Sequence, residues 1–254
     1  MDLNLSDKTA LVTGANRGTG QIIASALAFE GTQVIVHSNQ RPDDAQTDGV
    51  VFGDLATAEG CEQVLAQLQG RNVDILVNNY GSADRHSWQD SDTDKWQQMY
   101  EINVLSAVRL CQGLSGGMRQ RGWGRIVLLG TIGSHQPNHI MPAYYAAKGA
   151  LATMGVSLAK ELSNTGITVN TVAPGLILTD ELEAAYRAAA ARKGWPDDWD
   201  SIERKIVESD FPNPCGRIAR REEVADLVVF LCSERAAFIN GQNIRIDGGA
   251  VRYV

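Results

Sequence analysis

The chain has 254 residues, of which 44% are hydrophobic and 21% charged, a size and composition that suit one α/β domain with a substantial core. Its net charge of −7 with no basic stripe argues against nucleic acid and anionic membrane as partners. Four scattered cysteines without a CxxC pair, no visible signal peptide and no apolar run long enough to span a bilayer together predict a cytoplasmic protein.

Short apolar runs alternate with helical patterns along the whole chain. This alternation predicts a single Rossmann-type α/β domain spanning 1–254, with a doubly wound, seven-stranded parallel sheet and helices on both faces. Ligands of such sheets bind outside the carboxyl ends of the strands, so the polar residues that follow the strands should face one crevice. The predicted strands are 9–12, 33–36, 50–52, 73–77, 125–129, 167–172 and 243–246, and the predicted helices are 21–30, 57–69, 93–114, about 142–164, 181–193 and 221–232.

A glycine-rich turn, Thr13–Gly20, follows the first strand and precedes a helical pattern that Gly31 closes. Glycines let the backbone approach a pyrophosphate, and a helix N-terminus offers N–H groups and a partial positive charge. The spacing is G-x3-G-x-G rather than the commoner G-x-G-x-x-G. The flanking strand and helix nevertheless favour a dinucleotide phosphate site over a simple turn.

The end of the second strand bears on the choice of dinucleotide. An acid at this place accepts a hydrogen bond from the ribose of NAD, whereas NADP requires a nearby cation and no acid. No carboxylate occurs from His37 to Arg41 or anywhere before Asp43, and Arg17 stands in the glycine-rich turn. We therefore expect NADP(H) to be preferred, with NAD(H) possible. Arg41 is either a phosphate contact or a solvated loop charge.

Two further strands end in polar residues. Asp54 follows the third strand, where it either accepts from the adenine amino group or caps the next helix. The fourth strand leads into Asn78-Asn79-Tyr80-Gly81. Asn103 falls in the middle of a long predicted helix, where a polar side chain needs a partner.

Tyr144 and Lys148 are four residues apart and lie on one face of the helix that contains them. Free tyrosine has a pKa near ~10 and is a poor base at neutral pH. A nearby ammonium together with a second cation could lower that pKa by about two to three units, which would create a general acid/base near neutrality. The same spacing also occurs on ordinary helix surfaces.

Two other segments suggest walls of a pocket. His135 and His139 have the spacing of a metal pair, but a proline breaks the loop between them and no third ligand lies close in sequence. We expect this loop to line the pocket and expect no metal. Segment 180–215, which contains Trp195 and Trp199, predicts an amphipathic unit packed on itself, a mobile lid over an apolar or aromatic substrate, or both.

Jointly, these motifs resemble those of the classical short-chain dehydrogenase/reductase family over essentially the whole chain. The resemblance implies an NAD(P)-dependent oxidoreductase, usually a tetramer or dimer, with a generic similarity to 3-oxoacyl-thioester reductases. The motifs are TGxxxGxG at Thr13–Gly20, NNxG at Asn78–Gly81, Asn103, YxxxK at Tyr144 and Lys148, PGxIxT at Pro174–Thr179 and DGG at Asp247–Gly249.

The resemblance also implies roles for individual residues. Tyr144 would be the acid/base, Lys148 would lower its pKa and hold the ribose hydroxyls, and Asn103 would position a water in a proton relay. With Thr131 these three would form the catalytic set. The cofactor residues implied are Gly14, Asn16, Arg17, Gly18, Thr19, Gly20, Ser38, Asn39, Asp54, Leu55, Asn79, Gly81, Tyr144, Lys148, Pro174, Gly175, Ile177 and Thr179.

Two positions depart from the family pattern. Thr131 stands where the family usually has serine, and Tyr80 replaces the small alanine of NNAG. Ser134 is the alternative source of a hydroxyl. The departures fit either an adapted pocket or a weakened enzyme, and the complete set of proton-handling groups favours the adapted pocket.

The sequence therefore predicts an NADP(H)-dependent enzyme that interconverts a ketone and a secondary alcohol on a small-molecule substrate. An NAD-dependent catabolic alcohol dehydrogenase would share this chemistry and differ in its cofactor. A non-catalytic dinucleotide-binding regulator is the alternative from another class, and the intact Tyr144, Lys148 and Asn103 argue against it. The substrate, the direction and the stereochemistry are not encoded in these motifs.

Overall fold

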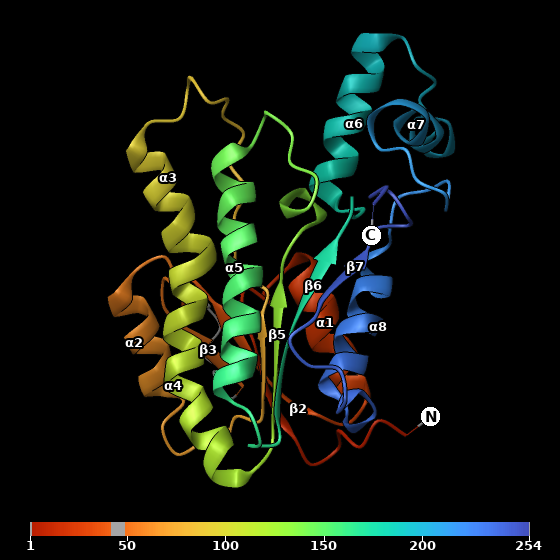
Figure 1. Ribbon diagram of the computed structural model, residues 1–254. Coiled ribbons are helices and arrows are strands. Elements are labelled where there is room, and N and C mark those ends of the chain that lie inside the picture. The colour runs from red at the N-terminus through yellow and green to blue at the C-terminus, as the bar shows by residue number, and fades with distance from the viewer. Residues whose placement is uncertain (1, 42–48, 254) are drawn as a thin grey trace.

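A parallel sheet forms the centre of the molecule (Figure 1). The computed structural model describes residues 2–41 and 49–253, so Asp43, which bounds the acid-free stretch after the second strand, lies outside the described residues. The strand order is β3-β2-β1-β4-β5-β6-β7 and each neighbouring pair is parallel, which confirms the predicted fold class. The strands are β1 (Thr9–Val12), β2 (Gln33–Ser38), β3 (Val50–Phe52), β4 (Ile75–Asn78), β5 (Gly124–Leu129), β6 (Ile167–Pro174) and β7 (Asn243–Ile246).

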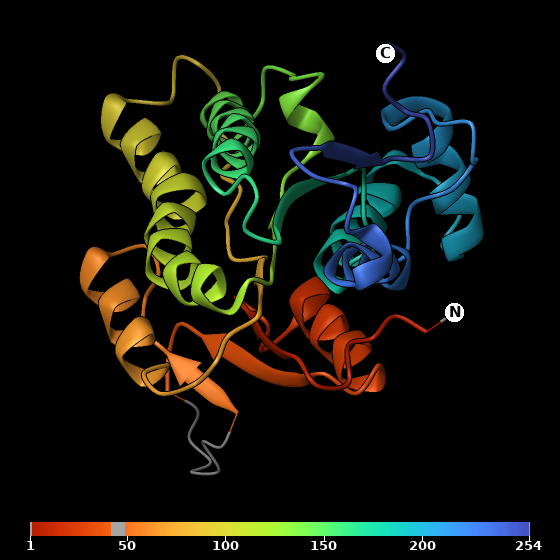
Figure 2. The ribbon, with the colours of Figure 1, turned by 60° about the horizontal axis from the view of Figure 1, so that its bottom comes forward.

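Helices cover both faces of the sheet, with α1 and α8 on one face and α2, α4 and α5 on the other (Figures 1 and 2). None of the helices within 2–41 and 49–253 has the length and apolar character needed to cross a bilayer. The helices are α1 (Gly18–Phe29), α2 (Ala58–Gln67), α3 (Thr93–Tyr100), α4 (Ser106–Arg121), α5 (Pro142–Glu161), α6 (Asp180–Lys193), α7 (Trp199–Lys205) and α8 (Arg221–Cys232).

Alternate residues of each central strand enter two separate cores. On β1, Leu11 packs toward α2, α4 and α5, whereas Ala10 and Val12 pack toward α1 and α8. All three are fully buried, and complete burial of such a Leu or Val side chain contributes about 1.5–3 kcal/mol. Burial on both faces explains why these strands are continuous apolar runs rather than alternating ones. It also fixes the register that brings the carboxyl ends of the strands to one edge.

The predicted helix 93–114 is divided in the structure. A π-helical turn, Glu101–Leu105, separates α3 from α4. Asn103 lies in this turn, and its Nδ2 donates to the carbonyl of Met99 at 3.0 Å. This bond provides the partner that a polar residue in mid-helix requires. It belongs to a local irregularity that a periodic apolar pattern does not encode.

Residues with a left-handed backbone conformation lie just beyond the ends of two helices. Gly31 has φ +83 and closes α1 as predicted. Helix α5 ends at Glu161, earlier than the predicted 164, because Asn164 with φ +62 and Gly166 with φ +76 already belong to the reversal into β6.

Segment 180–215 projects beyond the carboxyl ends of the strands, where α6 and α7 stand above β6 (Figure 1). Its helices have a small apolar core of their own, formed by Ala190, Ile202 and Ile206 together with Ile218, against which Trp195 and Trp199 pack. The self-packed interpretation of this segment is therefore confirmed. Its movement as a lid stays a prediction.

Candidate active site

Two cavities open at the carboxyl ends of the strands. They share Asn79 and Gly81 and so form the two halves of one crevice. The first half, about 380 Å³, is lined by Gly14, Asn16, Arg17, Ser38, Asn39, Gln40, Asn79, Tyr80 and Gly81. The second half, about 160 Å³, is lined by Thr19, Asn79, Gly81, Ser82, Ala83, Leu129, Gly130, Tyr144, Lys148, Pro174 and Ile177.

The glycine-rich turn has the shape that a pyrophosphate requires. Asn79 Nδ2 donates to the carbonyls of Thr13 at 3.0 Å and Gly14 at 3.1 Å. A Cβ on Gly20 would lie 2.5 Å from both Asn79 Nδ2 and the Gly14 carbonyl, so only glycine fits there. Gly18 has φ +62 and opens onto free space. The N–H groups of the first turn of α1 have no helical carbonyl to bind and carry a partial positive charge, so these residues fit a dinucleotide phosphate.

The larger half of the crevice carries the groups expected to select NADP. Ser38 at the end of β2 and Arg17 in the turn line the same cavity. The guanidinium of Arg41 lies 5.7 Å from the ring centroid of Phe52, a distance at which a cation is attracted to the ring face. Arg41 therefore lies beside the end of β3, where its side chain stays exposed.

Asp54 contacts two residues that line this cavity and does not cap a helix. Its Oδ1 accepts from Asn39 Nδ2 at 3.3 Å and from the Tyr80 hydroxyl at 3.4 Å. The N-cap of α2 is Thr57, so the capping interpretation of Asp54 is wrong. Leu55 is fully buried in the core and does not line either half of the crevice.

Lys148 and Tyr144 stand together on α5 at the wall of the smaller half. Lys148 is 4% exposed, and its Nζ donates to the carbonyl of Leu129 at 2.7 Å. The same Nζ lies 5.9 Å from the centroid of the Tyr144 ring. Burial lowers the pKa of Lys148 to about 8.

The pKa of Tyr144 moves opposite to the expected direction. Burial first, and then the neighbouring phenol of Tyr145, raise it to about 12, while a hydrogen bond with Thr131 acts in the lowering direction. The expected lowering required the ammonium together with a second cation, and with Lys148 as the one cation beside the ring the cost of desolvating the phenolate prevails. A phenol that ionises near neutrality would require a second positive charge beside it.

Thr131 and Ser134 differ in what their hydroxyls can still do. Thr131 Oγ1 accepts from the N–H of Gly133 at 3.1 Å, and the Thr131 hydroxyl acts to lower the pKa of the nearby Tyr144 phenol. Ser134 Oγ donates to the Thr131 carbonyl at 2.7 Å and is used in that turn. The arrangement favours Thr131 as the hydroxyl beside Tyr144, although neither residue lines the cavity itself.

Asn103 holds the loop after β4 in place. Its Nδ2 donates to the Ser82 carbonyl at 2.9 Å, and its Oδ1 accepts from the Ser82 N–H at 3.2 Å. A Cβ on Gly81 would lie 2.7 Å from Asn103 Oδ1 and 3.0 Å from Lys148 Nζ, so the three groups meet closely. The side chain is thus occupied by main-chain partners, and its part in a water relay stays a prediction.

The predicted residues after β6 fall into two groups. Pro174 and Ile177 line the crevice. Gly175 instead packs against Phe211, since a Cβ there would lie 2.8 Å from the Phe211 ring. The side chain of Thr179 caps α6. In the structure Gly175 therefore serves packing and Thr179 serves helix capping.

The loop between Thr131 and Tyr144 is tied to the C-terminal region. His135 Nε2 lies 2.9 Å from Asn243 Nδ2, and the His135 carbonyl accepts from the hydroxyl of Tyr253. Within the described part of the chain, no three His, Cys, Asp or Glu side chains gather into a set that could hold a metal.

Sequence reasoning did not assign three residues that lie in the crevice or behind it. Gln40 and Tyr80 line its larger half, and the fully buried His37 lies against the glycine-rich turn. A histidine inside an otherwise apolar strand was the available signal for His37. Tyr80 was visible only as a departure from a family motif.

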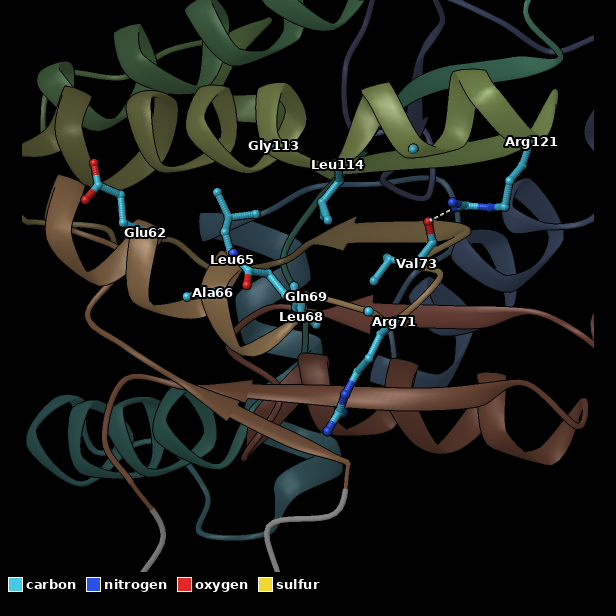
Figure 3. A pocket seen from close by; sticks show the side chains of 12 residues that line it. Glu62, Leu65, Ala66, Leu68, Gln69, Arg71, Val73, Gly113, Leu114 and Arg121 are labelled. Atoms are coloured by element: carbon cyan, nitrogen blue, oxygen red, sulfur yellow. Dashed lines mark hydrogen bonds between the residues drawn. The ribbon is translucent and has the colours of Figure 1, made fainter.

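A larger hollow of about 460 Å³ lies between α2 and α4, away from this crevice (Figure 3). Leu65 and Leu114 face each other across it, and Arg121 binds the carbonyl of Val73 at its edge (Figure 3). None of the predicted site residues lines this hollow.

The fold and the crevice define a single-domain dinucleotide-binding protein with a tyrosine–lysine pair at the end of the cofactor groove. A family model described as "Enoyl-(Acyl carrier protein) reductase" matches residues 14–251. The chain belongs to the short-chain dehydrogenase/reductase family.

Individual relatives cover the whole chain. It is 35% identical to an uncharacterised oxidoreductase of Bacillus subtilis, YvaG, over 100% of both chains. It is 33% identical to the 3-oxoacyl-[acyl-carrier-protein] reductase FabG of Escherichia coli, over 97% of this chain and 98% of FabG. The crystal structure of L-sorbose reductase from Gluconobacter frateurii, complexed with NADPH and L-sorbose, has a TM-score of 0.91 at 33% identity over 100% of both chains.

Proposed function

We propose that this chain is an NADP(H)-dependent oxidoreductase that interconverts a ketone and a secondary alcohol, with Tyr144 as the acid/base. The observation that carries the proposal is the position of Tyr144 and Lys148 in the smaller half of the crevice. That half joins, through Asn79 and Gly81, the half that the glycine-rich turn borders. A bound nicotinamide would supply or accept the hydride.

In the reducing direction, the protein must give a proton to the substrate oxygen. The phenol of Tyr144, with a pKa of about 12, is protonated at neutral pH and can act as that general acid. We expect Thr131, whose hydroxyl acts on the Tyr144 pKa, to donate to the same oxygen and to stabilise the charge that develops on it. The oxidising direction needs the phenolate instead.

Two positive charges favour that phenolate. Lys148 lies beside the Tyr144 ring, and its pKa of about 8 leaves it mainly charged at neutral pH. A bound, oxidised nicotinamide would supply the second positive charge. Lys148 is also the group expected to hold the ribose hydroxyls, which would align the cofactor with the phenol.

The preference for NADP(H) is supported by Ser38 in place of an acid, by Arg17 on the same cavity and by the positive charge of Arg41 beside Phe52. The NADPH in the sorbose reductase complex points the same way. We expect a higher kcat/KM with NADPH than with NADH. Ser38→Asp should shift the preference toward NADH by repelling the 2′-phosphate. A wild-type enzyme that prefers NADH would contradict this part of the proposal.

The substrate class is tested by a panel of ketones. L-sorbose reductase and 3-oxoacyl-[acyl-carrier-protein] reductase, by their names, act on ketone substrates of very different shape. The panel should therefore contain ketoses, 3-oxoacyl thioesters, cyclic ketones and aryl ketones, with NADPH oxidation as the readout. Reduction of at least one class supports the proposal. NADPH binding without turnover on any of them would favour the non-catalytic regulator.

We further propose that the chain works as a homotetramer or dimer in the cytoplasm. A hollow of about 570 Å³ between α4 and α5 supports self-association, because apolar side chains of Val108, Met154 and Leu158 line it. Light scattering of the purified protein should give the mass of two or four chains. A monomeric mass at micromolar concentration would contradict this part.

A further inference from the structure

His37 lies under the glycine-rich turn and joins the ends of three strands. It sits on β2 and is 0% exposed. Its Nδ1 lies 3.1 Å from the N–H nitrogen of Gly14, which follows β1. Its Nε2 lies 2.9 Å from the carbonyl of Gly53, which follows β3. The ring of Tyr80, which follows β4, packs edge-on against the imidazole with centroids 6.1 Å apart.

These two partners determine the state of the ring. A main-chain N–H can only donate, so Nδ1 facing Gly14 must carry a lone pair. A carbonyl can only accept, so Nε2 facing Gly53 must carry the hydrogen. Burial also lowers the pKa of His37. The imidazole is therefore neutral, and each nitrogen has one buried main-chain partner.

His37 takes up two consecutive amides of the turn. Its side chain binds the Gly14 N–H, and its own carbonyl accepts from the Ala15 N–H at 3.1 Å. On the other side of the turn, Asn79 binds the carbonyls of Thr13 and Gly14. The first residues of the turn are thus clamped from both sides, and the amides that follow at the start of α1 stay directed at the crevice.

We propose that His37 is a positioning residue for the dinucleotide, because its neutral imidazole fixes the glycine-rich turn in the conformation that receives the pyrophosphate. The proposal rests on the proposed use of a dinucleotide cofactor. His37 is fully buried and does not line the crevice, so it acts through Gly14 rather than by touching the ligand. It should affect cofactor binding and leave the chemistry at Tyr144 unchanged.

The first test is His37→Leu, which keeps the volume apolar and removes both hydrogen bonds. The buried Gly14 N–H then has no side-chain acceptor. Without cofactor, the glycine-rich turn can adopt other conformations, and binding of the cofactor must first restore the binding conformation. Because a lost buried hydrogen bond corresponds to roughly one factor of ten, we expect KM and Kd for NADPH to rise about tenfold. kcat at saturating NADPH should stay close to the wild-type value.

A matched pair of variants separates this role from general stability. In His37→Asn the side-chain oxygen can take the place of Nδ1 and accept from Gly14, but the side chain is too short for Gly53. In His37→Gln the amide can reach the Gly53 carbonyl, while the acceptor for Gly14 is lost. We therefore expect His37→Asn to recover most of the NADPH affinity that His37→Leu loses, and His37→Gln to bind NADPH as weakly as His37→Leu. The pair also decides the question if the Leu variant does not fold.

The measurements are NADPH Kd by nucleotide fluorescence, steady-state KM and kcat, and the thermal midpoint without ligand. Wild-type affinity in all three variants, a Gln rescue without an Asn rescue, or a fall in kcat at unchanged KM would each overturn the role of His37. Failure of the wild type to bind either NADPH or NADH would instead overturn the proposed function. If NADH proves to be the cofactor, the same variants are measured with NADH, since both dinucleotides carry the pyrophosphate.

Discussion

Replacing Lys148 with methionine should remove activity without destabilising the fold. The lysine is buried and charged at neutral pH, and burial holds its pKa at about 8 instead of 10.5. That difference corresponds to a cost of about 3 kcal/mol for keeping the charged form in the folded state at pH 7. Methionine has a similar length and packs as an unbranched apolar chain. The mutation relieves this cost.

The relief is partly offset. Lys148 Nζ donates to the Leu129 carbonyl at 2.7 Å, and a hydrogen bond to a charged group contributes about 1.5–3 kcal/mol. The net change in the free energy of unfolding at pH 7 should therefore be between about zero and 1.5 kcal/mol in favour of the variant. Most single substitutions destabilise a protein, so even a neutral outcome is informative.

The pH dependence gives the sharper test, measured by urea unfolding of both proteins from pH 7 to about pH 10.5. Because the folded-state pKa of Lys148 is lowered to about 8, the unfolded chain binds more protons than the folded chain between about pH 8 and the ordinary value. The wild type should therefore gain stability relative to Lys148→Met as pH rises through that window. Below about pH 8 the difference should be constant.

Lys160→Met serves as the control, because Lys160 is an exposed lysine in the last turn of the same helix. A difference between wild type and Lys148→Met that stays constant from neutral to alkaline pH would refute the reasoning. A loss of several kcal/mol at pH 7 in Lys148→Met would refute it as well, since the lysine would then stabilise the fold.

Two further expectations follow from the crevice and its lid. Thr131→Val, which loses the hydroxyl beside Tyr144, should lower kcat about 10²–10³-fold, whereas Thr131→Ser should stay active. Ser134→Ala should change kcat only mildly, because the Ser134 hydroxyl binds the Thr131 carbonyl. The reverse pattern in these kinetics would move the assignment to Ser134. Trp195 and Trp199 should change their fluorescence when a substrate analogue joins the complex with cofactor, as tested with Trp195→Phe and Trp199→Phe. No ligand-dependent signal from either tryptophan would favour a static packing of segment 180–215.

The sheet was predictable because its strands are buried on both faces. A run such as Thr9–Val12 carries the signal of a parallel strand within four residues. The ends of elements were less predictable, since they depend on contacts distant in sequence. Strand β6 continues to Pro174 because its last residues pair with β7. The π-helical turn at Glu101–Leu105 has no periodic signature at all.

The same limit applies to the site. Motif residues such as Gly20 and Asn79 were identifiable, because their spacing reflects a close main-chain approach that only certain residues allow. The direction of the Tyr144 pKa was not identifiable, because it depends on how far the fold buries the phenol. His37 was missed for a related reason. Its two hydrogen bonds join residues 23 and 16 positions away in sequence, which only the register of the sheet brings together.

The central claim is that Tyr144 moves the proton, and the adjacent Tyr145 provides an internal control. Tyr145 is 8% exposed and packs its ring against Gly133, and its centroid lies 5.6 Å from that of Tyr144. The decisive measurement is kcat for NADPH-dependent reduction of the best ketone by Tyr144→Phe and Tyr145→Phe, with the NADPH Kd of each. The account predicts a loss of about 10²–10⁴ in kcat for Tyr144→Phe at nearly unchanged Kd, and a mild effect for Tyr145→Phe. Full turnover by Tyr144→Phe, or the large loss in Tyr145→Phe instead, would contradict it.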